Sequence, residues 1–286
     1  MSPPAVREGV MTVSAAPTSA ASFDHSALER GLASLALPDW EIERRRAAVE
    51  RLAELALPDR RDENWMRTDL RAFRPAAWQP FGPPPVGAPP AGLLAETIRL
   101  AESSAANDPG DEARCSRLSG SVVSLDGVVH CESLDASLRE QGVVFGSPER
   151  LLAEHPELLR QHWFGVIDSE SDWFAAAHAA FARAGAVLVV PPGVKIAEPL
   201  HLLSAISPGG VDFGHVLVVL GEEAEATVLT ETAGGGPVGS SGGFHCGGTE
   251  IVVGRRAFLR MVNLQNWNTG VWHLARQKAT VEADGR

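Results

Sequence analysis

Residues 218–224 read VVLGEEA, and residues 251–257, which lie 33 positions later, read IVVGRRA. In both segments a short β-prone run ends at a glycine, and two charged residues and an alanine follow. A strand, a charged turn and a second strand that recur at a fixed interval indicate a β-solenoid, in which each coil buries its inward side chains on the next. A β-sandwich is the alternative, because its strands are also separated by turns at short intervals.

The chain around this repeat divides into five parts. We predict a disordered tail (1–23), a helical arm (24–77), a Pro-rich linker (78–110), a small α/β segment (111–184) and a truncated core of coiled β-strands (185–286). Apolar periodicity and flanking residues predict helices over 38–57, 148–160 and 172–183, the last closing at Gly185. Asp126-Gly127 between two β-prone runs predicts a hairpin turn.

Composition narrows the range of functions. The chain has 286 residues, of which 44% are hydrophobic and 21% charged, and its net charge is −11. This charge argues against nonspecific binding to nucleic acid or an anionic membrane, because both surfaces repel it. The first 23 residues do not read as a signal peptide, and the longest apolar run, 184–194, is too short to cross a bilayer. We therefore expect a cytoplasmic protein.

Neither the basic run nor the spacing of the cysteines indicates a site. The run Arg44 to Arg46 is surrounded by glutamates at helical spacing, which predicts a solvated helix face rather than a phosphate site. Cys115, Cys131 and Cys246 form no CxxC pair, which argues against a disulfide framework.

His245, Cys246 and Glu250 place imidazole, thiol and carboxylate within six residues, a set that binds iron or zinc if the side chains converge. Only Cys246 and Glu250 share strand parity, and a bulge at Gly247-Gly248 would shift even that register. The structural alternative is a buried thiol beside a structural histidine. We find no catalytic motif, and the Gly-rich run 234–243 lacks the ending of a phosphate-binding loop.

The order of several segments resembles the SufB/SufD family of iron-sulfur cluster assembly proteins, and SufD most closely. Residues 63–70 (ENWMRTDL) are similar to the family's E-x-W-x-x-T-D-L segment. Residues 173–181 and 185–194 with Pro199-Leu200 resemble the helix and first strands of its core, and residues 264–267 with 276–281 resemble later coils. The resemblance runs from about Trp40 to the last residue.

The resemblance implies a mainly β fold, a right-handed parallel β-helix after an α-helical and small α/β region. It implies a noncatalytic scaffold of the SUF machinery that pairs with a SufB-type paralogue, while a SufC-type ATPase docks on a C-terminal helical segment. We expect the chain alone to hold no cofactor, with a transient iron-sulfur cluster in the complex.

Two departures from the family qualify these expectations. The sequence ends at Arg286 inside a predicted coil, so we expect a truncated β-helix that lacks the ATPase-docking segment. SufB-type chains carry a cysteine just after the glutamate of the segment at 229–233, where this chain has Thr232 and Ala233. Because thiolate is the preferred iron-sulfur ligand, this favours the accessory SufD-like role.

Two other functions remain as alternatives. A carbohydrate-active β-helix enzyme would need a groove lined with Asp, Lys or Arg, and the arm with its tryptophan argues against it. A cupin-like metal-binding protein would use His245 and Glu250, but the His-x-His pair of that site is absent from the sequence.

Overall fold

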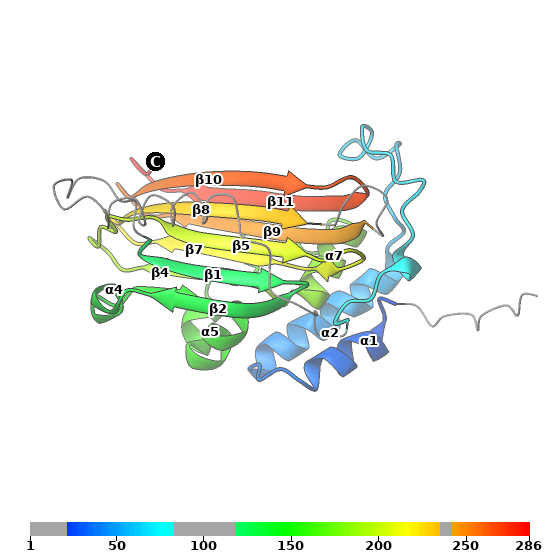
Figure 1. Ribbon diagram of the computed structural model, residues 1–286, viewed down its shortest axis with the longest axis horizontal. Helices are drawn as coiled ribbons and strands as arrows, with labels where there is room; N and C mark the ends of the chain where they lie inside the picture. Colours follow the sequence, from blue (N-terminus) through cyan, green and yellow to red (C-terminus); the bar gives the residue numbers. More distant parts are fainter. Residues whose placement is uncertain (1–21, 83–117, 235–241) are drawn as a thin grey trace, which may run out of the picture.

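The computed structural model describes residues 22–82, 118–234 and 242–286 of a mainly β protein (Figure 1). Residues 1–21 of the predicted tail, most of the predicted linker and Cys115 lie outside these residues, and the division into five parts stays a prediction. The helices are α1 (His25–Leu32), α2 (Asp39–Glu54), the 3₁₀ helix η1 (Pro75–Ala77), α4 (Ala136–Glu140), α5 (Pro148–Glu154), α6 (Pro156–Arg160) and α7 (Trp173–Phe181). Within the described ranges, every helix is too short or too polar to span a membrane.

The strands belong to two sheets. They are β1 (Gly120–Leu125), β2 (Val128–Leu134), β3 (Val144–Gly146), β4 (Gly185–Val190), β5 (Leu200–Ile206), β6 (Val211–Asp212), β7 (His215–Leu220), β8 (Glu225–Gly234), β9 (Gly243–Val253), β10 (Phe258–Trp267) and β11 (Val271–Val281). Sheet A has the order β10-β8-β5-β1-β2, and sheet B has the order β11-β9-β7-β4-β3. Only the β1–β2 and β3–β4 neighbours are antiparallel, so both sheets are mixed.

Successive long strands alternate between the sheets from β4 onward, and the predicted repeat appears as strand register. Val218 of β7 pairs with Ile251 of β9, 33 residues later, and the β8–β10 pair has the same offset. The turn after β7 is acidic and the turn after β9, which lies beside it, is basic. Arg256 Nε donates a hydrogen bond to Glu223 at 2.8 Å, and both residues have positive φ. The repeat is confirmed, and the hand of the coil stays a prediction.

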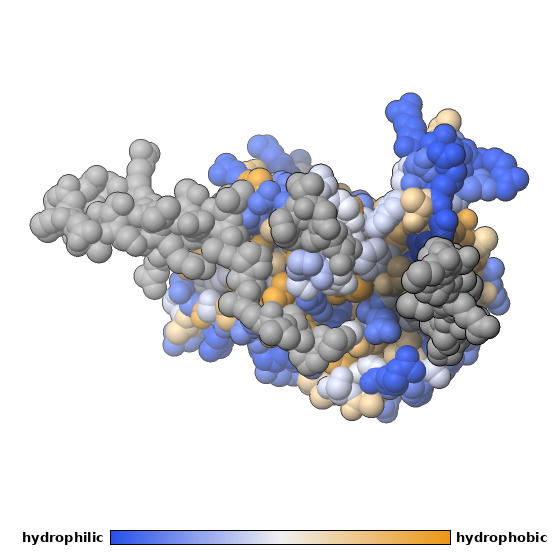
Figure 2. Space-filling view, turned by 45° about the vertical axis from the view of Figure 1, so that its right-hand side comes forward, coloured by the Kyte–Doolittle hydropathy of each residue, from blue (hydrophilic) through white to orange (hydrophobic). Residues whose placement is uncertain are grey.

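Helices cover the outer face of sheet B. Leu151, Leu152 and Leu159 of α5 and α6 pack against Val187 and Leu217 of the sheet. The arm helices α1 and α2 pack with α7 in a second apolar cluster, and Figure 1 shows them at one end of the stacked strands. The segment that follows α2 protrudes from the surface in Figure 2 and is hydrophilic. The side chain of Arg61 in this segment is 91% exposed. The arm is therefore joined to sheet B through α7.

Local predictions met different outcomes. The hairpin is confirmed, because Leu125 pairs with Val128 across the Asp126-Gly127 turn. The helix predicted over 148–160 is broken at His155, where Pro156 starts α6. The cap predicted at Gly185 is wrong: α7 ends at Phe181, and Gly185 has its φ of +112° at the start of β4. A Cβ there would lie 2.0 Å from the His215 carbonyl oxygen, so close strand approach explains this glycine.

Candidate functional site around strand β9

The three predicted metal ligands lie on β9, which runs in unbroken register beside β11 from Gly243 to Val253. No bulge therefore interrupts Gly247-Gly248, and alternate side chains point to opposite faces of sheet B. His245 points between the sheets, whereas Cys246 and Glu250 point to the outer face. Four residues of extended strand separate the last two by about 13 Å, too far for one ion to bind both.

Cys246 is a buried thiol beneath α7. Its Sγ donates to the carbonyl oxygen of Phe174 at 3.4 Å, and its side chain belongs to the apolar cluster under the arm. Burial raises the pKa of this thiol far above its ordinary value. Because the thiolate is the form that binds metal or attacks a sulfur atom, Cys246 is held in its unreactive form. Cys131 on β2 is exposed, and both described cysteines are free.

Glu250 ties a loop to sheet B. Its Oε1 accepts hydrogen bonds from the backbone N–H groups of Val166 and Ile167 at 2.6 and 2.7 Å, and its Oε2 lies 3.2 Å from His215 Nε2. Burial opposes ionisation, but His215 and the two N–H donors outweigh it and lower the pKa of Glu250. Both oxygens of this carboxylate are bound by protein groups, which indicates a structural role.

His245 lies inside the molecule, in contact with two residues that the sequence analysis did not select. Its Nε2 is 3.5 Å from Oδ2 of Asp212 on β6, and its Nδ1 is 2.9 Å from Nδ1 of His273 on β11. The signal that would have found His273 is the register of the coil, which pairs it with His245. Sequence proximity alone did not give that register.

The predicted ligands thus enter three separate environments. Within residues 22–82, 118–234 and 242–286, no three His, Cys, Asp or Glu side chains come together closely enough to hold a metal ion. His245, Cys246 and Glu250 do not converge, because β9 turns the first away from the other two and the length of the strand separates Cys246 from Glu250.

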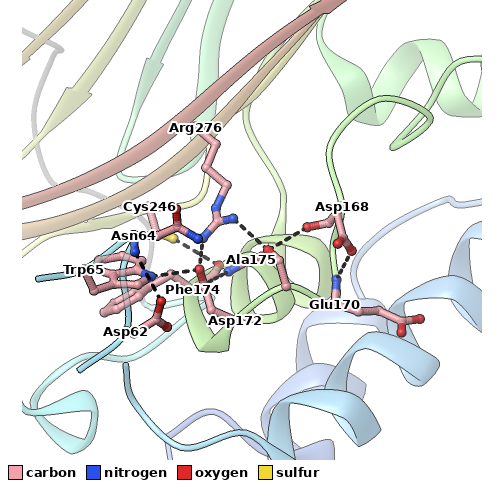
Figure 3. A network of polar contacts seen from close by, with 11 residues as sticks. Asp62, Asn64, Trp65, Asp168, Glu170, Asp172, Phe174, Ala175, Cys246 and Arg276 are labelled. Carbon is pink, nitrogen blue, oxygen red and sulfur yellow. Dashed lines mark hydrogen bonds and ion pairs between the residues drawn. The ribbon is translucent and has the colours of Figure 1, made fainter. Parts of the chain in front are cut away.

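A second polar site joins the arm to the core, in a pocket of about 450 Å³ (Figure 3). Asp172 caps α7 by accepting from the N–H of Ala175 at 3.0 Å, and it also accepts from Trp65 Nε1 at 3.2 Å. Arg276 of β11 pairs with the same carboxylate and donates to Ser171 Oγ. One buried carboxylate therefore holds together the arm, α7 and β11.

Comparisons with known proteins show the family of the chain. The family model of the SUF system FeS cluster assembly, SufBD core domain, matches residues 203–286, and that of the SufBD protein N-terminal region matches residues 100–202. The chain belongs to the SufBD family. It is 28% identical to the iron-sulfur cluster assembly protein SufB of Bacillus subtilis over 172 residues, which is 60% of this chain and 37% of that protein.

A SufBD family protein of Staphylococcus epidermidis is 27% identical over 175 residues, which covers 61% of this chain and again 37% of the relative. The SufBD chain described here therefore matches little more than a third of the length of these relatives. Iron-sulfur cluster assembly is the general role that the family membership supports.

The SufBD core has a cavity of about 70 Å³ between its sheets, lined by both apolar and polar residues. Its polar lining comes from both sheets and consists of Ser124, Ser204, Thr230, Glu231, Thr232, His245, Thr249, Asn263, Gln265 and His273. Thr232 is therefore an interior residue. A cavity of this size and polarity can hold several water molecules.

Proposed function

We propose that this chain is a noncatalytic, SufD-like scaffold of the SUF machinery, built on a right-handed parallel β-helix and acting in the cytoplasm. The observation that carries the proposal is Thr232, a hydroxyl in the interior cavity where SufB-type chains have a thiol. A hydroxyl is a poor ligand for iron-sulfur clusters. The buried Cys246 thiol does not replace it, because its high pKa keeps it protonated.

Partner binding supplies the function in this proposal. The chain pairs with a SufB-type paralogue, which brings cluster ligands, and a SufC-type ATPase joins the complex. Among the described strands, β10 and β11 are the sheet edges at the same end of the coil, and each has a strand neighbour on one side only. Unpaired edge groups are a template for pairing with another chain. A transient iron-sulfur cluster forms in the complex, and the chain alone holds no cluster.

Co-purification tests the proposal. We would express this chain, and separately a longer form extended beyond residue 286, together with the SufB-type and SufC-type proteins of the same source. Size exclusion with iron and sulfide analysis should give a complex that contains the SufB-type protein, and the cluster should require that partner.

The controls separate the possible results. Binding by the longer form alone would place the partner surface outside residues 1–286 while keeping the scaffold role. Failure of both forms to bind would overturn the proposal. Turnover of a pectin-like polysaccharide by the chain would instead favour a carbohydrate-active β-helix enzyme.

A further inference from the structure

His245 and His273 form an in-register pair on neighbouring parallel strands. Their rings lie 4.8 Å apart between centroids, and their Nδ1 atoms face each other at 2.9 Å. The Trp267 ring lies 5.2 Å from each of them and closes one side of the pair. Two imidazole nitrogens therefore converge on one point at the wall of the interior cavity.

Asp212 lies beside the other ring nitrogen of His245. Its carboxylate is 1% exposed, accepts a hydrogen bond from Ser204 Oγ and lies 3.5 Å from His245 Nε2. A carboxylate beside Nε2 favours the tautomer with the proton on that atom, which leaves the lone pair of His245 Nδ1 directed at His273. The hydrogen bond between the rings then runs from His273 Nδ1–H to His245 Nδ1.

We propose that His245 Nδ1 and His273 Nδ1 form a two-histidine binding site for a divalent first-row transition-metal ion, with Asp212 orienting His245 from behind. Neutral imidazole is a preferred ligand for Zn²⁺, Fe²⁺, Ni²⁺ and Cu²⁺. A metal-bound histidine commonly donates its other N–H to a carboxylate, which is the position that Asp212 occupies. His273 takes up the ion by moving its proton from Nδ1 to Nε2, so the two rings release no proton.

The geometry needs only a small adjustment. Two nitrogens bound to one tetrahedral Zn²⁺ at about 2.0–2.1 Å lie about 3.3 Å apart, a few tenths of an ångström more than the distance in the structure. His273 can supply this movement, because it is partly exposed and lies on the edge strand β11. The proposed site thus differs from the one predicted from the sequence. It keeps His245, but its second ligand is His273 on the neighbouring strand β11 in place of Cys246 and Glu250.

The site has a route to solvent. His273 lines both the interior cavity and the larger pocket between the arm and β11. No third His, Cys, Asp or Glu of the described residues completes the set, so water or an incoming ligand takes the remaining coordination positions. An ion with two protein ligands and open positions is exchangeable, which distinguishes this site from a closed structural metal site.

Metal titration of the untagged, full 286-residue chain tests the proposal. We expect one Co²⁺ or Zn²⁺ per chain, measured by competition with a chromophoric chelator. Pulsed electron paramagnetic resonance of the Cu²⁺-loaded chain should count two bound imidazoles. His245→Ala and His273→Ala should each weaken binding by about ten-fold or more, and Asp212→Asn by roughly 10–100-fold.

The matched control is His130→Ala on β2, which removes an exposed histidine away from the cavity and should leave affinity unchanged. The resonance experiment on the wild-type chain needs no variant, so it decides the question even if an interior substitution prevents folding. One or no coordinated imidazole, or undiminished binding in folded His245→Ala and His273→Ala variants, would overturn the proposal.

Discussion

His178 on α7 is a buried histidine that makes stability depend on pH. Its side chain is 1% exposed and its ring stacks on His215 at 5.1 Å. Burial lowers its pKa well below 6.5, and His215 and Arg44 act in the same direction. The unfolded chain binds this proton near pH 6.5 and the folded chain does not, so the stabilising contribution is complete above that pH and is lost as the pH falls.

We therefore predict that the free energy of unfolding falls on acidification below about pH 6.5, by up to about 1.4 kcal/mol per pH unit for this proton. Urea unfolding at several pH values between about 5 and 7.5 measures the slope. His178→Gln, which cannot ionise, should reduce the slope, and the exposed-site control His130→Gln should not. An identical slope in wild type and His178→Gln would contradict this account.

At the level of the element, α2 carries a buried ion pair where the sequence predicted a solvated face. Glu41 is fully buried and accepts from Arg45 Nε at 2.7 Å, and Arg45 is 2% exposed. Arg46 alone follows the prediction, with an exposed pair to Glu29. Glu41 and Arg45 are one helical turn apart, on the face that also carries the buried Ala48 and Leu52, and α7 and α1 cover that face.

We predict that Glu41→Gln destabilises the protein by about 3–5 kcal/mol, because it leaves the Arg45 charge buried without its partner. The control Arg46→Ala breaks only an exposed pair and should cost less than about 1 kcal/mol. Equilibrium urea unfolding of both variants checks the difference. If both variants lose equally little unfolding free energy, water must solvate the Arg45 guanidinium when Glu41 is replaced.

Features that depend on neighbouring residues, such as turns and repeats, could be predicted from the sequence. The side-chain contacts between coils could not. The hairpin at Asp126-Gly127 and the 33-residue offset follow from turn chemistry and a visible repeat. The parity of Cys246 and Glu250 was correct, but parity does not say which helix covers that face. His245 meets His273 because β9 and β11 pair at an offset of 28 residues, a spacing that the visible repeat does not contain.

For the whole molecule, attachment of the arm depends on a cluster of aromatic rings. Phe73 is 1% exposed and its ring lies 5.0–6.2 Å from the rings of Trp173, Phe174, Phe244 and Trp272, which come from α7, β9 and β11. Phe73→Ala should cost about 3–5 kcal/mol and speed proteolysis of the arm. The control Met66→Ala, at a side chain 54% exposed, should change stability by less than about 0.5 kcal/mol. Slow proteolysis of a destabilised Phe73→Ala variant would show that the arm is held elsewhere.

The last prediction concerns the exposed edge strands β10 and β11. Val262 on the edge strand β10 is 43% exposed and Val281 on the edge strand β11 is 54% exposed, so apolar side chains lie beside unpaired backbone groups. Such edges pair with other chains, and charged side chains on an edge strand prevent this pairing.

We predict that the 286-residue chain self-associates as its concentration rises, and that Val262→Lys with Val281→Lys weakens the association by about ten-fold or more, equivalent to about 1.4 kcal/mol. Sedimentation measures the change, and His130→Lys at an exposed position on β2, at the opposite edge of sheet A, is the control. If that control weakens association as much as the β10 and β11 substitutions do, the chains meet through another surface, and the open end is not the one that a partner covers.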